Sequence, residues 1–182
     1  PRSAFSESYR SVRTALQFST DRGVPKVLLV TSPSAAEGKS TTALTLARNF
    51  AQLGKRVLLI EADLRNPSLH RSIGVRAEMG LSSLLSGAAS IQQVIMDTDD
   101  ERLNVVLAGP LPPNPAELLA GSRLLSMLSV AAEKYDQVII DGPPVLGIAD
   151  APILSSLVSG TLLVTKSGKT RIKTAQIGRA HV

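Results

Sequence analysis

A run of small residues followed by a lysine and hydroxyl side chains is the strongest chemical signal in this sequence. Residues 31–42 read TSPSAAEGKSTT and directly follow the apolar run Val27–Val30. Backbone N–H groups of such a loop can surround phosphate oxygens, and a lysine at the start of the next helix can neutralise them. The pattern G-x-x-x-x-G-K-[ST] is complete except at its first glycine, where Pro33 stands. The alternative is an ordinary capped turn between a strand and a helix. The predicted phosphate-binding residues are Ser34, Ala35, Ala36, Glu37, Gly38, Lys39, Ser40 and Thr41.

Carboxylates follow two further apolar runs. Glu61 and Asp63 come after residues 57–60 (VLLI), and Asp141 comes after residues 138–140 (VII). A carboxylate at the end of a buried strand loses solvation unless a cation or hydrogen-bond donors face it. Mg²⁺ would meet that need, whereas capping of a helix or pairing with Arg65 is the other interpretation. Together with the lysine loop, these residues predict a magnesium–nucleotide site.

The elements that must position these residues alternate between strands and helices. Apolar strand-like runs occur at residues 27–30, 57–60, 105–107, 138–140 and 162–164, and helical patterns occur at residues 40–53, 122–134 and 150–157. Strands that are apolar throughout are typical of a parallel sheet covered on both faces. The sequence therefore predicts an α/β fold, a doubly wound and mostly parallel sheet flanked by helices. Ligands of such sheets bind beyond the carboxyl ends of the strands.

An amphipathic helix is predicted before the first strand, over residues 6–18. Tyr9, Val12 and Leu16 share one side of it, whereas Arg10 and Arg13 lie around the other. Residues 109–115 (GPLPPNP) are expected to form a loop that ends where a helix begins near Pro115, since proline lacks the N–H donor. We divide the chain into an N-terminal helix with its linker (1–25) and a nucleotide-binding domain (26–176).

Composition removes several classes of function. The chain of 182 residues has no cysteine and two histidines, which excludes a disulfide scaffold, a thiolate zinc site and a multi-histidine metal site. Its net charge of +5 is concentrated at the two ends of the chain, so we do not expect nucleic acid as a partner. No apolar run reaches the ~20 residues of a membrane span, and no signal peptide is evident. We expect a cytoplasmic domain.

These motifs resemble those of the bacterial tyrosine autokinases of capsular and exopolysaccharide systems. That family has a P-loop, an apolar run followed by D-x-D-x-R, and another followed by D-x-x-P. The corresponding segments here are Ser34–Thr41, Glu61–Arg65 and Asp141–Pro144. Residues Glu7–Arg13 (ESYRSVR) are similar to the family's E-x-x-R-x-x-R oligomerisation motif, and Gly109–Leu119 is similar to a further signature. The implied fold is that of the P-loop NTPases.

The resemblance implies transfer of the γ-phosphate of ATP to tyrosines of a neighbouring copy, with ATP and Mg²⁺ as cofactors. Lys39 and the loop amides would hold the phosphates, and Thr41 would lie on the α-phosphate side. Ser40 and Asp141 would bind Mg²⁺. Asp63 would hold a metal-bound water or the incoming hydroxyl, so it stands among both the metal-binding and the catalytic residues.

Two departures from the family pattern bear on activity. Glu61 occupies the position of the family's first aspartate, which activates the acceptor tyrosine, and its side chain is one methylene longer. The family carries a tyrosine-rich tail, whereas this chain has only Tyr9 and Tyr135. We interpret Tyr135 as a packing residue. This fragment is therefore expected to lack acceptor tyrosines and to be inactive unless a tail is supplied.

The resemblance also implies partners and a location. Glu7, Arg10 and Arg13 would join copies into a ring, the alternative being a solvated helix face. A membrane activator of the polysaccharide co-polymerase type, fused or separate, and a cognate tyrosine phosphatase are the other expected partners. The expected location is the cytoplasmic face of the bacterial inner membrane.

Regulatory ATPases and nucleotide-dependent assembly modules are the alternative functions for this fold. ATPases of the ParA/MinD type have a second lysine five residues before the P-loop lysine, and that position is Ser34 here. The absence of this lysine favours the kinase interpretation over a regulatory ATPase or a nucleotide-dependent assembly module.

The end of the sequence is predicted to be incomplete. The family's domain continues past Lys173 with the rest of a helix, a strand and the tail. Residues 177–182 (IGRAHV) match one reading frame of a common sequencing adapter, so we expect a C-terminally truncated chain that ends in a non-native segment.

Overall fold

The computed structural model describes residues 4–21, 23–168, 170–171, 173–174 and 176. The six residues predicted to derive from an adapter, 177–182, lie outside the described residues.

A six-stranded sheet with strand order β3-β4-β2-β5-β1-β6 forms the centre of the molecule. Its strands are β1 (Val27–Thr31), β2 (Val57–Glu61), β3 (Met96–Asp97), β4 (Leu103–Val106), β5 (Gln137–Asp141) and β6 (Gly160–Leu163). All neighbouring pairs are parallel except β3 with β4. The predicted doubly wound, mostly parallel sheet is confirmed, with an antiparallel edge strand that the sequence pattern did not predict.

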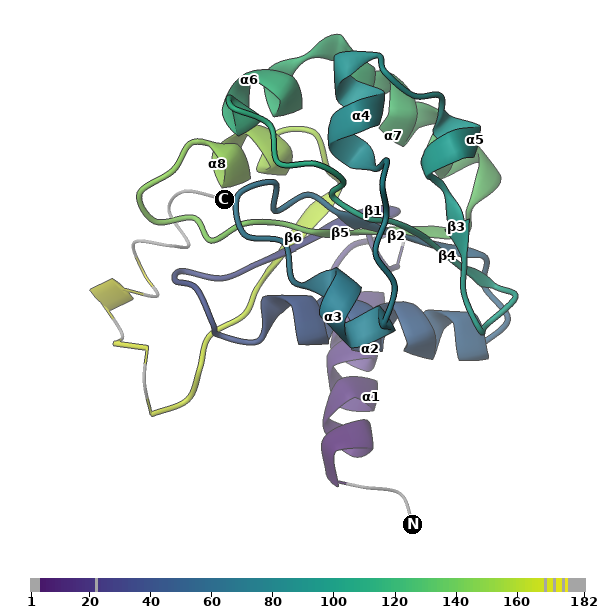
Figure 1. The fold of residues 1–182 in the computed structure, drawn as a ribbon. Helices are drawn as coiled ribbons and strands as arrows, with labels where there is room; N and C mark the ends of the chain where they lie inside the picture. The colour runs from purple at the N-terminus through teal and green to yellow at the C-terminus, as the bar shows by residue number, and fades with distance from the viewer. Residues whose placement is uncertain (1–3, 22, 169, 172, 175, 177–182) are drawn as a thin grey trace.

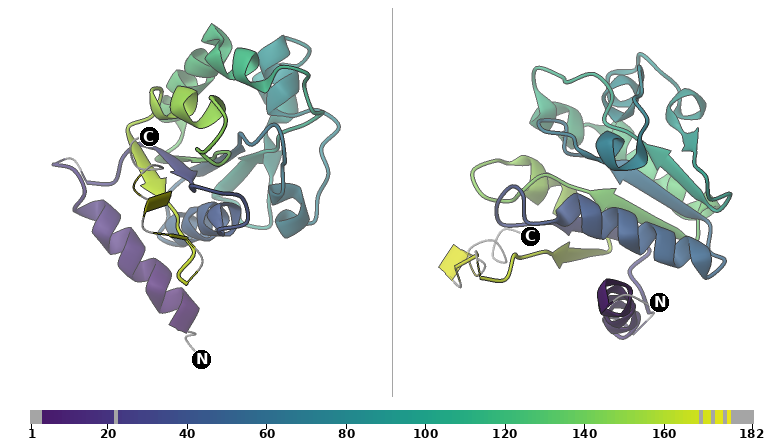
Figure 2. Two further views of the ribbon diagram at one scale, coloured as in Figure 1. Left: turned by 90° about the vertical axis from the view of Figure 1, so that its left-hand side faces the viewer. Right: turned by 60° about the horizontal axis from the view of Figure 1, so that its bottom comes forward.

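Helices cover both faces of this sheet (Figure 1). One face carries α2 (Lys39–Gln52) and α3 (Leu69–Ile73), and the N-terminal helix α1 (Ala4–Gln17) packs outside α2 (Figure 2). The other face carries the remaining helices, which are α4 (Leu81–Ser86), α5 (Ile91–Val94), α6 (Pro115–Ala120), α7 (Ser122–Lys134) and α8 (Asp150–Ser155). The helices predicted around residues 6–18, 40–53, 122–134 and 150–157 are present, and a helix starts at Pro115 as expected.

Alternation along each strand divides the core between the two faces. Val27 and Leu29 of β1 pack with the face of α4 to α8, whereas Leu28 and Val30 pack with the face of α2. All five residues of β1, β2 and β5 are buried, which is why these strands are apolar without a polar side. The sheet is therefore rigid where β1, β2 and β5 end, and the site is built at those ends.

Helix α1 is attached to the domain by its apolar side. Leu16 is buried, and Tyr9 and Val12 pack against the core on the α2 side of the sheet. The hydroxyls of Tyr9 and Thr42 are 3.1 Å apart, so α1 touches the first turn of α2. Among the described residues, no helix has the length and apolar character needed to cross a bilayer.

Candidate phosphate-binding and transfer site

Strand order brings the three predicted motifs to one edge of the sheet. Strand β5 lies between β1 and β2, and Asp141 at its end pairs with Val30 of β1 and with Glu61 of β2. The loop after β1 and the segment after β2 therefore flank the end of β5 from its two sides. The lysine loop and the carboxylates, far apart in the sequence, converge as predicted.

The loop after β1 wraps around the start of α2. Gly38 precedes α2 with φ 92° and ψ 13°, a left-handed conformation that leaves its N–H and the following ones unhindered. No side chain among the described residues caps this helix terminus. Beside it lies a cavity of about 550 Å³, lined by loop and helix residues Ala35, Ala36, Gly38, Lys39, Ser40 and Thr41, by Asp63, Arg65, Asn66 and Ser68, and by Pro144, Leu146 and Ile148. Uncapped N–H groups that face a cavity form an anion-binding arrangement.

Ala36 has a φ of 61°, a conformation that a Cβ atom disfavours. Replacing Ala36 with glycine is therefore expected to stabilise the domain by about 0.5–1 kcal/mol, because relief of the strain exceeds the added entropy of the unfolded chain. Thermal unfolding measures the change, and Ala35→Gly is the matched control, since Ala35 has no positive φ. An unfolding temperature of Ala36→Gly below that of the unaltered chain would contradict the backbone strain at Ala36.

Lys39 is the centre of the charged site. Its side chain is 9% exposed, and its Nζ lies 2.9 Å from Asp63 Oδ2 and 4.0 Å from Asp141 Oδ1. One buried ammonium group thus faces two buried carboxylates, one from the segment after β2 and one from the end of β5. These three groups carry a net negative charge, which an added cation would neutralise.

Asp141 has the environment expected of a cation ligand. Both of its carboxylate oxygens are buried without a hydrogen-bond partner among the described residues. Burial raises the pKa of Asp141 to about 6, although Lys39 opposes this shift. The Ser40 hydroxyl also favours the charged form, yet it lacks the geometry of a hydrogen bond to Asp141. The donor set of Asp141, Asp63 and Ser40 fits Mg²⁺, which binds few protein carboxylates and completes its shell with phosphate oxygens and water. Consistently, the described residues hold no group of three or more acidic, histidine or cysteine ligands.

Glu61 and Asp63 are placed differently although both follow β2. Asp63 accepts from Lys39 and from the Asn66 N–H, and it lines the phosphate cavity. Glu61 accepts from the backbone N–H groups of Ser68 (2.7 Å), Leu69 (2.6 Å) and Ala108 (3.1 Å), and it lines an adjoining cavity. The carboxylate of Glu61 therefore holds the start of α3 against the end of β4, as the helix-capping interpretation anticipated.

Arg65 joins the two segments that flank the phosphate cavity. Its Nε and Nη2 donate to the two oxygens of Asp150 at 2.8 and 2.9 Å, and the Asp150 side chain is fully buried. Arg65 follows β2, whereas Asp150 opens α8 after the β5 loop. Arg65 was considered as a partner of Glu61 or Asp141, so Asp150 is a site residue that the sequence interpretation missed. An Asp at the first residue of an expected helix was the available signal.

Replacing Asp150 with asparagine is expected to lower the free energy of unfolding by about 1–3 kcal/mol, because a charge-assisted pair of hydrogen bonds is lost and a buried amide is left poorly matched. Urea unfolding measures this change. Asp136→Asn is the control, since Asp136 pairs with Arg56 on the surface and should matter much less. Equal effects of the two substitutions would contradict the role of burial.

The other residues predicted from the sequence lie near the phosphate cavity, on α1 and beside β4. Ser40 is half-buried with its Oγ 3.0 Å from Ser68 Oγ, and Thr41 is exposed beside the cavity. On α1, Glu7 and Arg10 form an exposed ion pair with each other at 2.9 Å, and Arg13 is partly exposed. The proposed oligomerisation side chains therefore lie away from the apolar side of α1. Tyr135 packs against the core and donates to Asn104 Oδ1, and burial raises its pKa.

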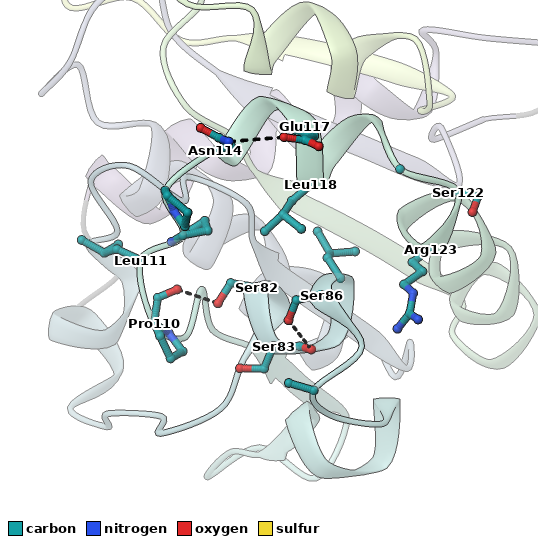
Figure 3. Close-up of a pocket in the computed structure, with 15 residues that line it drawn as sticks. Ser82, Ser83, Ser86, Pro110, Leu111, Asn114, Glu117, Leu118, Ser122 and Arg123 are labelled. Atoms are coloured by element: carbon teal, nitrogen blue, oxygen red, sulfur yellow. Dashed lines mark hydrogen bonds between the residues drawn. The ribbon is translucent and has the colours of Figure 1, made fainter.

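A larger cavity, of about 710 Å³, lies on the opposite side of the sheet from α2 (Figure 3). It is lined by α4, α6, α7 and the proline-rich loop after β4, whose Pro110 carbonyl accepts from the Ser82 hydroxyl. No residue of the segment Gly109–Leu119 lines the phosphate cavity, although Gly109 and Leu111 line the cavity that adjoins it.

Sequence comparison places the chain among known proteins. A family model described as an AAA domain matches residues 26–170. The chain is 44% identical over 170 residues to the tyrosine-protein kinase YwqD of Bacillus subtilis, covering 93% of this chain and 72% of that protein. It is 35% identical over 179 residues to the putative tyrosine-protein kinase CapB of Staphylococcus aureus, covering 97% of this chain and 78% of that protein.

Structural comparison agrees. The kinase domain of the Escherichia coli tyrosine kinase ETK superposes with a TM-score of 0.91 at 34% identity, covering 96% of this chain and 68% of that one. The septum site-determining protein MinD of Pyrococcus horikoshii, in a complex with Mg-ADP, superposes with a TM-score of 0.72 at 23% identity, which shows a shared fold.

Proposed function

This chain belongs to the bacterial tyrosine-protein kinases built on a P-loop AAA domain, and we propose that its site transfers the γ-phosphate of ATP to tyrosine hydroxyls of a neighbouring copy. It is a protein-tyrosine kinase domain with a nucleotide-binding fold. The observation that supports the site assignment best is Lys39, which is buried between Asp63 and Asp141 beside the uncapped start of α2.

We assign the β- and γ-phosphates to Lys39 and to the backbone amides of residues 34–41. Lys39 donates to Asp63, so it would turn from that carboxylate toward the phosphates when nucleotide binds. Thr41, exposed at the third residue of α2, is the candidate for the α-phosphate side. Lys39 already lines the cavity, which supports this assignment.

Asp141, Ser40 and Asp63 are the residues that would hold Mg²⁺. The unpaired oxygens of Asp141 support this assignment most strongly. The ion supplies charge neutralisation of the phosphate oxygens when bound.

In the transfer step, the acceptor tyrosine approaches the γ-phosphorus from the side opposite ADP. The tyrosine oxygen forms a bond to the γ-phosphorus while the bond from that phosphorus to the bridging oxygen breaks, and ADP leaves. We assign the hydroxyl proton to Glu61, which lines the adjoining cavity, and the orientation of the hydroxyl to Asp63, which lines the phosphate cavity. Because the transition state is loose, positioning and charge contribute more than basicity.

We further propose that the kinase acts in the export or chain-length control of capsular or exopolysaccharide. Curated relatives include a putative tyrosine-protein kinase in the cps region of Klebsiella pneumoniae. The chain would then work at the cytoplasmic face of the inner membrane, in a ring joined by Glu7, Arg10 and Arg13, with a membrane activator and a tyrosine phosphatase as partners. Glu7 is exposed and Arg10 and Arg13 are partly exposed, which supports a role for them in such contacts.

The direct test uses ATP labelled on its γ-phosphate and a synthetic tyrosine-rich peptide as acceptor. Labelled phosphotyrosine supports the kinase. Release of labelled inorganic phosphate without phosphotyrosine would instead identify a regulatory ATPase, and nucleotide-dependent assembly with neither product would identify an assembly module.

A further inference from the structure

A second cavity, of about 370 Å³, adjoins the phosphate cavity and shares Arg65 and Asn66 with it. Its volume lies within the ~300–1,000 Å³ range of small-ligand sites. The segment that follows β2 therefore separates two cavities. The mechanism above uses the one that contains Lys39 and, of the second cavity, only Glu61.

The back wall of this second cavity is built from closely packed backbone. Ala108 donates to Glu61, and Leu81 donates to the Leu107 carbonyl at 2.8 Å. A Cβ atom on Gly80 would lie 2.3 Å from the Leu107 oxygen, so only glycine permits this approach. The wall thus has a fixed position.

The front of the cavity is cationic. Helix α3 lies on one face of the sheet and α4 on the other, so the connection between them crosses the sheet edge (Figure 1). Arg71 of α3 and Arg76 of this connection line the cavity, with His70 beside them. Both arginines are exposed, and neither side chain forms an ion pair or hydrogen bond with any residue that the structure describes.

The acidic side chain in this cavity does not balance these arginines. Glu61 directs its oxygens to the three backbone N–H groups of residues 68, 69 and 108. Arg65 is already bound to Asp150, so it does not repeat their role. Arg71 and Arg76 remain as two guanidinium groups with unused donors, and guanidinium binds phosphate through paired hydrogen bonds.

Apolar side chains complete the lining. Pro67, Ala77, Leu107 and Leu111 contribute to the wall, and Leu107 is buried. A ligand that suits both parts has a flat apolar body and a doubly charged oxyanion. A phosphorylated tyrosine side chain has that composition, whereas inorganic phosphate has no ring and does not use the apolar part.

We propose that this second cavity binds a phosphotyrosine side chain that a neighbouring copy already carries, with Arg71 and Arg76 on its phosphate and the apolar wall on its ring. The proposal rests on the proposed function, since the ligand is the product of that reaction. It adds a product-recognition site beside the transfer site, which would keep a partly phosphorylated neighbour engaged.

Binding can be tested without any turnover. The probe is a fluorescently labelled peptide, Gly-Ala-pTyr-Ala-Gly, and its anisotropy is measured with the chain in Mg-ADP. We expect the dissociation constant to be at least tenfold lower than that of the same peptide with plain tyrosine. Phenyl phosphate should displace the probe at much lower concentration than inorganic phosphate.

The double variant Arg71→Ala/Arg76→Ala should weaken phosphopeptide binding at least tenfold, and Arg71→Lys/Arg76→Lys should weaken it less, because lysine retains charge but not the paired geometry. Arg48→Ala/Arg123→Ala is the matched control for loss of two exposed charges outside this cavity, and it should bind as the unaltered chain does. Affinity for Mg-ADP verifies that each variant is folded.

Three results would overturn the proposal: equal affinity for the two peptides, unchanged binding by the double alanine variant, or equal loss in the control. Equal displacement of the probe by inorganic phosphate and by phenyl phosphate would exclude the proposed contact with the tyrosine ring. These outcomes are independent of the kinase assay, because a chain that fails to make phosphotyrosine can still be tested for binding it.

Discussion

Replacing Lys39 with methionine is expected to lower the rate of phosphate transfer to tyrosine by at least about 10²–10³-fold, because a positioned charge on the transferring phosphate is removed. Lys39 lines the phosphate cavity, and its ammonium group lies between Asp63 and Asp141. The measurement is the initial rate of phosphotyrosine formation with γ-labelled ATP and a tyrosine-rich peptide. A rate within tenfold of the unaltered chain would contradict the assignment of Lys39.

Loss of activity in Lys39→Met must be separated from loss of the fold. Methionine leaves Asp63 and Asp141 buried without their ammonium partner, and removal of one member of a buried pair costs about 3–5 kcal/mol. The double variant Lys39→Met/Asp63→Asn removes one charge of each sign and should recover much of that stability. We expect it to be folded and still inactive, which assigns the defect to chemistry.

Replacing Asp141 with asparagine is expected to stabilise the metal-free domain while abolishing its response to Mg²⁺ and nucleotide. Burial raises the pKa of Asp141 from 3.8 to about 6, so the folded state binds this proton more tightly than the unfolded state. Stability contributed by this group is therefore greatest at low pH and declines as the pH rises from about 4 to about 6. Above pH 6 the cost of the buried charge is about 3 kcal/mol.

Chemical unfolding at pH 5 and pH 7.5 without metal measures this effect. Asp141→Asn should gain about 1–3 kcal/mol at pH 7.5 and less at pH 5. Asp99→Asn, an exposed site, serves as the control and should change neither value appreciably. Added Mg-ADP should raise the unfolding temperature of the unaltered chain and leave that of Asp141→Asn unchanged. A less stable Asp141→Asn at pH 7.5 would contradict a net cost of burying the Asp141 charge.

The sheet and the convergence of its strand ends could be predicted from the sequence because the signal is local. Strands buried on both faces must be apolar throughout, and the runs at residues 27–30, 57–60 and 138–140 have no other good interpretation. The P-loop then identifies the edge of the sheet at which the strands that carry Glu61 and Asp141 must end. Strand β3, with two residues, is too short to carry a pattern.

Helices α3, α4 and α5 were not predicted, because each has only four to six residues, too few for a helical period to stand out from the sequence. Their position depends on tertiary contacts such as the hydrogen bonds from Ser68 and Leu69 to Glu61. The second cavity is built around α3 and the connection to α4, so neither it nor the free arginines could be located from spacing.

The hydrogen-bond partner of Arg65 could not be predicted from the sequence either. Glu61, Asp141 and Asp150 were each available to a guanidinium group after β2, and only the path of the β5 loop places Asp150 within reach. Glu61 illustrates the same limit, since its neighbours in space are the amides of residues 68, 69 and 108. Pairings between loops follow from the arrangement of the strands and not from the loops' own residues.

Transfer between copies is the central claim, and a mixing experiment tests it most directly. Unaltered chain is combined with a Lys39→Met/Asp63→Asn copy of different mass that carries an added tyrosine-rich tail, and γ-labelled ATP is supplied. We predict labelled phosphotyrosine on the tail of the inactive copy, at a rate that rises with the concentration of the unaltered chain. Hydrolysis of ATP with no label on that tail would contradict the account.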